Sequence, residues 1–234
     1  MVFFTLVGPI RWTFLFHAIA GSLALALLMV PLLSKKGGTL HVRTGWIYTV
    51  LMVMVGVTAL VITPWRMNSD PHRNPETQSF AIFLAFIAVL ALSSLWFGLI
   101  ALKHKTRKTG TIAPQFVLPP MLLGLFAGLV EFVGLQSGSS LLIVFPLLGF
   151  WISRKQIRYW TLAPVTRMHW WYAHMNGMSI ACISTVTAFL VTALPRIWPS
   201  DITRSPVLWV APGVIMGSIF SRWQKSYALQ FKDV

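Results

Sequence analysis

The chain has 234 residues, of which 56% are hydrophobic and 10% are charged, and its mean hydropathy is +0.72. Soluble globular domains carry about one quarter charged residues, so this composition excludes an ordinary soluble protein and predicts an all-α integral membrane protein. We expect a single membrane domain over residues 1–234. The 19 Lys and Arg, against 5 Asp and Glu, are expected to face the anionic headgroups of the lipid bilayer rather than nucleic acid.

The apolar runs of the sequence predict a bundle of seven transmembrane helices. A helix needs about 20 apolar residues to cross the hydrocarbon core of a bilayer. Such runs lie near residues 12–33, 46–64, 80–102, 115–135, 139–153, 171–194 and 206–221. The fifth is the weakest, because its continuous apolar run, 141–152, has only 12 residues. A run this short is also typical of a re-entrant or tilted segment.

The distribution of Lys and Arg predicts the orientation of these spans. Segments 34–45, 103–110 and 153–168, with the residues after 221, carry 14 of the basic residues, and the segments between them carry 5. Basic residues in short loops stay on the cytoplasmic side. Seven crossings, with the N-terminus outside and the C-terminus in the cytoplasm, give this alternation. It would break if the fifth segment did not cross.

Small and aromatic residues predict some of the packing. Gly124 with Gly128, and Gly213 with Gly217, form GxxxG motifs that let helix backbones approach closely. We expect them to serve packing inside the bundle, and a dimer interface is the open alternative. The aromatic side chains of 157–160 are expected to anchor that stretch along the inner membrane interface.

Two ionisable residues are expected on the outer side of the membrane. Glu131 is the one carboxylate inside a predicted span, and no Lys lies in the middle of a span, which excludes a retinal Schiff base. His17 and Glu131 each lie roughly 7–8 Å deep, counted along their helices. They are a candidate proton-relay or quinone-side pair, and a neutral hydrogen-bonded pair that fixes two helices is the alternative.

Four other histidines map to the inner edge and are candidate cofactor ligands: His41, His104, His169 and His174. Imidazoles at one level on several helices can supply axial ligands to haem b or bind a transition metal. His41 and His174 are the leading candidates for a haem or metal ligand. Ordinary interfacial histidines are the alternative. The sequence has no HExxH, Walker, GxGxxG, CxxC or GxSxG motif, so the usual hydrolases and nucleotide-driven pumps lose support.

Segments 17–21, 36–48, 174–178, 185–191 and 209–212 carry a resemblance that touches most of the chain. They resemble a family of uncharacterised bacterial multi-pass membrane proteins, a domain of unknown function. That family has a His in its first helix and a His-Arg-x-x-Gly-x-x-Tyr-like turn. Here one residue separates His41 from Arg43, which departs from that turn. The resemblance implies a multi-pass fold in a bacterial inner membrane. The family's histidines are similar, by analogy alone, to those of b-type cytochrome membrane domains.

Three functions remain open at this point. The leading hypothesis is a haem- or metal-binding, redox-type membrane protein that uses the inner-edge histidines for electron transfer. The second is an accessory or assembly subunit that packs against other membrane subunits of a larger complex. The third is a small-solute or proton transporter using Glu131, although seven spans do not divide into two equal inverted repeats.

Overall fold

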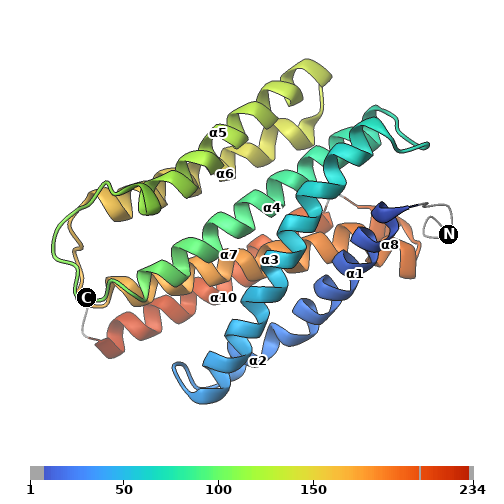
Figure 1. Cartoon of the computed structure of the whole chain (residues 1–234). Helices are drawn as coiled ribbons and strands as arrows, with labels where there is room; N and C mark the ends of the chain where they lie inside the picture. Colours follow the sequence, from blue (N-terminus) through green and yellow to red (C-terminus); the bar gives the residue numbers. More distant parts are fainter. Residues whose placement is uncertain (1–7, 206, 232–234) are drawn as a thin grey trace. The chain divides into compact units, whose positions relative to one another are not determined.

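The computed structural model describes residues 8–205 and 207–231, and in these ranges it consists of helices and turns without a strand (Figure 1). The predicted all-α fold is confirmed for this part of the chain. The helices are α1 (Pro9–Leu27), α2 (Met29–Leu33), α3 (Thr39–Asn68), α4 (Pro75–Ala101), α5 (Pro114–Ser137), α6 (Ser140–Thr161), α7 (His169–Thr192), α8 (Leu194–Ile197), α9 (Asp201–Arg204) and α10 (Val207–Phe231).

Six helical segments among the described residues are long and apolar enough to cross a membrane, as expected of a multi-pass membrane protein. They are Pro9–Leu33, Thr39–Asn68, Pro75–Ala101, Pro114–Ser137, Ser140–Thr161 and His169–Ile197. The segment expected to be the weakest span, 139–153, lies in the long helix α6 and is one of the six. The helix α10 is not one of them, and Arg222 and Lys225 follow its apolar part. The seventh crossing and the orientation of the termini stay predictions.

Contacts divide the chain into two compact units, residues 1–92 and 93–234, with the boundary inside α4. We call them the N-terminal unit and the C-terminal unit and describe each by itself. In the N-terminal unit α1 and α3 pack antiparallel. His17 of α1 contacts Thr58 of α3, whereas Pro31, further along the chain in α2, contacts His41 near the start of α3. The buried apolar residues of this packing are Ala20, Ala24, Leu28, Tyr48 and Met52.

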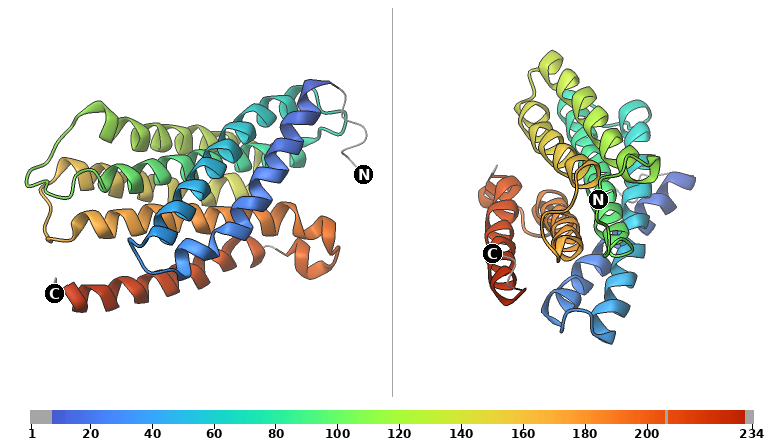
Figure 2. Two further views of the ribbon diagram at one scale, coloured as in Figure 1. Left: turned by 60° about the horizontal axis from the view of Figure 1, so that its bottom comes forward. Right: turned by 90° about the vertical axis from the view of Figure 1, so that its left-hand side faces the viewer.

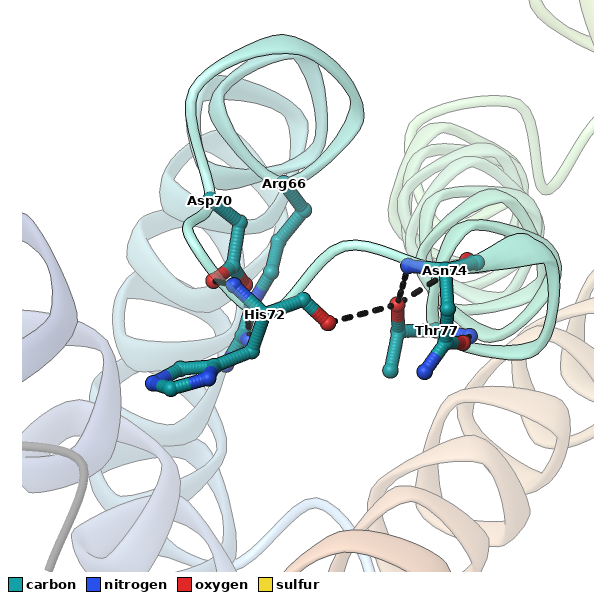
Figure 3. Close-up of polar contacts among 5 residues, drawn as sticks. All are labelled: Arg66, Asp70, His72, Asn74 and Thr77. Atoms are coloured by element: carbon teal, nitrogen blue, oxygen red, sulfur yellow. Dashed lines mark hydrogen bonds and ion pairs between the residues drawn. The ribbon is translucent and has the colours of Figure 1, made fainter.

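Polar side chains hold the turn between α3 and α4 (Figure 3). Arg66 donates to the Asp70 carboxylate at 2.5 Å, and Asp70 also accepts the backbone N–H of His72 at 2.9 Å. At the start of α4, the Thr77 N–H donates to Asn74 Oδ1 at 2.8 Å and the Asn74 N–H donates to Thr77 Oγ1 at 2.9 Å. This reciprocal cap satisfies N–H groups that the start of a helix leaves free.

The Asp70 carboxylate makes the stability of this turn depend on pH. Burial alone would raise the pKa of Asp70, but hydrogen bonds from the His72 backbone and from Arg66, with the Arg66 charge, outweigh it and hold the pKa below its ordinary value of 3.8. A carboxyl group whose pKa is lower in the folded state contributes stability above its unfolded pKa, and this contribution is lost as the pH falls through the folded pKa.

We therefore expect Asp70→Asn to lower stability at neutral pH by about 1 kcal/mol. The difference from the wild type should fade as the pH falls below 3.8, because the wild-type carboxyl then becomes protonated as well. Thermal denaturation of both proteins in detergent across this pH range measures the effect. A difference that stays constant down to the lowest pH would contradict it.

In the C-terminal unit α5 and α6 form an antiparallel hairpin (Figure 1). Its turn passes through Gly138, whose φ of 67° lies in the left-handed region that favours glycine. A Cβ added at Gly124 would lie 2.9 Å from Ser153 Oγ, and one at Gly128 would lie 3.7 Å from the Phe150 ring. The expectation that this GxxxG motif serves internal packing is confirmed.

Helices α7 and α10 lie side by side and antiparallel (Figure 2). At the start of α7, the Trp171 ring packs on Tyr227 and Phe231 of α10, with centroids 4.5 and 5.3 Å apart. A Cβ at Gly213 or Gly217 would meet no atom of the described chain within 4 Å. No described residue of the C-terminal unit therefore packs closely on this second GxxxG motif, and its role inside the bundle stays a prediction.

Two polar contacts tie the end of α4 to α5 and α6. The Trp96 Nε1–H donates to the Gln115 carbonyl at 2.9 Å, and this carbonyl lacks its usual helical partner because Pro119 has no N–H. Gln156, which is buried, accepts a hydrogen bond from Ser93 Oγ at 3.1 Å. These contacts hold the end of α4 against the helices whose adjoining loops carry the candidate site.

Candidate functional site

A cluster of aromatic and imidazole rings lies at the end of the C-terminal unit where α4 and α6 finish and α7 begins. We call it the loop-end cluster, and it comprises His104, Phe116, Tyr159, Trp160 and His169. The Trp160 side chain is 1% exposed and stacks on Phe116, with ring centroids 4.3 Å apart. The edges of His104 and Tyr159 meet Trp160 at 5.5 and 4.8 Å. Two of the predicted ligand histidines therefore belong to one packed group.

His169 is linked to this group through Tyr159. The Tyr159 hydroxyl and His169 Nδ1 are 2.9 Å apart, and which atom donates depends on the tautomer of the imidazole. His169 is 8% exposed, and its other nitrogen, Nε2, is buried without a hydrogen-bond partner among the described residues. The Lys105 backbone lies near this ring, but not in the geometry of a hydrogen bond. A buried polar atom without a partner is costly and rare in a folded protein.

Arg107 closes the end of α6. Its guanidinium donates to the carbonyls of Tyr159 at 2.6 Å and Leu162 at 2.7 Å, with a longer contact to the Trp160 carbonyl at 3.4 Å. The last carbonyls of a helix have no partner within the helix and carry its negative dipole end, so a cation stabilises them. The guanidinium also lies over the Tyr159 ring, at 4.7 Å. Among the described residues, its Nε is the second buried side-chain nitrogen that has no hydrogen-bond partner.

The start of α7 adds further positive potential beside these two atoms. The N-cap residue Met168 provides no side-chain acceptor, and the first turn carries no acidic residue. Lys105 lies over the Trp170 ring at 4.5 Å, and Arg107 is close enough to His169 to interact with it electrostatically. The ion pair found among the described residues joins Arg66 and Asp70, in the other unit. No described carboxylate therefore neutralises this positive region.

The remaining inner-edge histidine of the C-terminal unit, His174, ties α7 to α4. Its Nδ1 lies 3.1 Å from the Gly98 carbonyl. The two backbones nearly touch beside this bond, because a Cβ at Gly177 would lie 2.4 Å from the Ser94 carbonyl oxygen and 2.7 Å from Gly98 N. His104 makes a bond of the same kind, with Nδ1 2.9 Å from the Ile100 carbonyl. A carbonyl only accepts, so Nδ1 carries the proton in both rings.

His41 belongs to the N-terminal unit, where it caps α2. Its Nδ1 lies 2.9 Å from the Pro31 carbonyl, and Lys36 Nζ donates to the same carbonyl at 3.1 Å and to that of Leu32. The structure thus brings His104 and His169 together, places His174 further along α7, and leaves His41 in a separate unit. No three His, Cys, Asp or Glu side chains gather into a possible metal site within the described ranges.

The two residues of the predicted outer pair also lie in separate units. His17 Nδ1 is 2.9 Å from Thr58 Oγ1, and the Thr58 hydroxyl donates to the Met54 carbonyl at 2.6 Å, so the imidazole is the donor to Thr58. Glu131 lies half-buried on α5 in the C-terminal unit. The pairing of His17 with Glu131 stays a prediction.

Sequence reasoning missed the two residues that organise the loop-end cluster, Arg107 and Tyr159. Arg107 stands among three lysines in segment 103–110, where it reads as one more basic loop residue. One of its acceptors is the nearby Thr109 carbonyl, but those that close α6 lie more than 50 residues further along the chain. The one available signal is the aromatic pair Tyr159 and Trp160 at the end of an apolar helix, close to His169 in the sequence.

No family model matches the chain, and no curated protein or solved structure is significantly similar to it. The resemblance to a bacterial membrane-protein family gains no support from these comparisons and stays a prediction.

Proposed function

We propose that the C-terminal unit binds an anionic group, a phosphate or carboxylate, at the start of α7. The observation that carries this proposal is the pair of buried nitrogens without partners, His169 Nε2 and Arg107 Nε. An anion brings the acceptors that both lack, and charge-assisted hydrogen bonds to it are about twice as strong as neutral ones. The start of α7, which has no side-chain cap, adds the positive end of the helix dipole.

The charges around the site favour an anion over a metal cation. An Arg guanidinium has donors and no acceptor, so Arg107 Nε cannot ligate a metal. Its positive charge, close to His169, also opposes a second cation at His169 Nε2. Both nitrogens are covered in the structure, so binding requires the loop 103–110 to open. The Lys105 side chain of this loop is exposed and lies over the Trp170 ring.

The proposed setting of this site is the cytoplasmic surface of a bacterial inner membrane crossed seven times. Within the C-terminal unit, α10 packs along α7, a helix long and apolar enough to span. The contacts of Trp171 with Tyr227 and Phe231 bring the end of α10 to the start of α7. The bonds of Arg107 join loop 103–110 to the end of α6. Three of the four basic segments thus gather at one end of this unit, which supports a common cytoplasmic side.

Inorganic phosphate is the simplest probe of this site. Phosphate should raise the denaturation midpoint of the purified protein in neutral detergent by several degrees over chloride of equal ionic strength, because it binds the folded state. His169→Ala should remove the gain and Lys105→Gln should reduce it. His72→Ala, which deletes an exposed imidazole in the other unit, should keep it. An equal gain in His169→Ala, or no gain in the wild type, would overturn the proposal.

Haem b or transition-metal binding, with a role in electron transfer, is a second candidate. One observation favours it: Nδ1 of His41, His104 and His174 each bonds a backbone carbonyl, as metal-ligating histidines commonly do. A reduced-minus-oxidised spectrum with metal analysis of the purified protein tests it, and variants of His41 and His174 identify the ligands. The accessory-subunit hypothesis and the Glu131 transporter hypothesis stay predictions.

A further inference from the structure

Large apolar side chains stand exposed in the two loops that flank the anion site. Ile112, Leu162 and Val165 are 77%, 51% and 99% exposed. The loops are joined, because the Thr111 N–H donates to the Trp160 carbonyl at 2.7 Å and Arg107 donates to the Leu162 carbonyl at 2.7 Å. Apolar side chains therefore stand beside the proposed anion-binding donors.

Exposing such side chains to water costs about 25 cal/mol for each Å² of apolar surface. The cost disappears if hydrocarbon covers them, and the neighbouring Lys105 and Trp170 pair of a cation over an indole ring is typical of the membrane interface. A soluble anion explains the buried donors and leaves these apolar side chains unexplained. An amphiphile explains both, since its charged head and its chains need different surroundings a few ångströms apart.

We propose that the ligand is an anionic glycerophospholipid of the surrounding membrane, with its phosphate at His169 and Arg107 and its acyl chains against Ile112, Leu162 and Val165. This inference rests on the proposed anion site. It adds that the anion is delivered by a lipid, and that an apolar contact beside the site contributes to its affinity.

The test compares three probes on the purified full-length protein in neutral detergent: phosphatidylglycerol, phosphatidylcholine with the same chains, and inorganic phosphate. Phosphatidylglycerol should stabilise the protein at far lower concentration than inorganic phosphate, and phosphatidylcholine should have little effect. The double variant Leu162→Ser/Val165→Ser should need about tenfold more phosphatidylglycerol, a loss of about 1.4 kcal/mol, and should keep the full response to inorganic phosphate.

Leu129→Ser/Leu135→Ser is the matched control, because both residues are also more than half exposed but lie toward the far end of α5. It should leave the response to phosphatidylglycerol unchanged. Equal potency of phosphatidylglycerol and phosphatidylcholine, or equal losses in both double variants, would overturn the lipid inference while the phosphate response still stood. The anion site itself would be overturned if inorganic phosphate did not stabilise the wild type, or stabilised His169→Ala equally. The two failures are therefore distinguishable.

Discussion

Gly177→Ala is expected to destabilise the protein by about 2–3 kcal/mol, although it adds a single methyl group. The new Cβ would lie 2.4 Å from the Ser94 carbonyl oxygen, and 2.7 and 2.8 Å from Gly98 N and Cα. All three are backbone atoms of α4, which cannot move aside as the end of a side chain can. The helices must separate, and the bond between His174 and the Gly98 carbonyl should lengthen with them.

The measurement is the denaturation midpoint in detergent, which should fall by roughly 5–10 °C for a chain of this length. Gly213→Ala is the matched control, because it makes the same change inside a helix where a Cβ would meet nothing within 4 Å. It should be neutral or slightly stabilising, since Ala has the higher helix propensity by about 1 kcal/mol. Equal losses in the two variants would show that α4 and α7 do not approach as closely as the structure has them.

Helix composition made most of the fold predictable. Each of the first six predicted spans coincides with one of the six helical segments that could cross a membrane, although two of these segments consist of two consecutive helices. A long apolar run can satisfy its backbone in lipid only as a helix. The boundaries were less predictable. The helix α6 continues past 153 through Arg154 and Lys155 to Thr161, because local charge does not end a helix. The sequence identified Gly177 as a small residue suited to close helix packing. It could not predict that α4 is the helix that Gly177 contacts, because this depends on long-range packing.

The candidate site was predictable in residue type and much less in geometry. His104 and His169 both belong to the loop-end cluster, where one follows the end of α4 and the other begins α7. His41 and His174 lie outside this cluster and bond backbone carbonyls, at the end of α2 and at the crossing of α4 with α7. Carbonyl partners have no signature in the sequence, because every residue carries one and its availability depends on how the chain folds.

Several basic side chains donate hydrogen bonds to the last carbonyls of helices. The distribution of Lys and Arg therefore has a second cause, in addition to their preference for the cytoplasmic side of a membrane. Lys36 bonds the last carbonyls of α2 and Arg107 those of α6. On the predicted outer side, Arg73 bonds the Asn68 carbonyl of α3 and Arg196 bonds the Thr192 carbonyl of α7. The last carbonyls of a helix that ends on the outer side of the membrane also need hydrogen-bond donors. Two of the five basic residues that depart from the cytoplasmic preference are thereby accounted for.

Trp160→Ala is expected to destabilise the protein by about 3–5 kcal/mol, because it leaves a cavity at the centre of the loop-end cluster. A position at the end of a membrane span predicts an interfacial Trp whose removal costs little. The structure instead buries this ring to 1% exposure, with Phe116, Tyr159 and His104 around it. Without it, Tyr159 and His169 lose the surface that positions them, so phosphate should also stop stabilising the protein.

Trp151→Ala on the same helix separates the two roles. Its ring is 53% exposed, and its recorded polar contact is Lys155 Nζ at 3.8 Å from the ring centroid. We expect this control to lower the denaturation midpoint by no more than a few degrees, against roughly 10 °C or more for Trp160→Ala. Similar small losses in both variants would make Trp160 an interfacial residue after all. The aromatic packing could then not be what holds His169 Nε2 and Arg107 Nε in place for an anion.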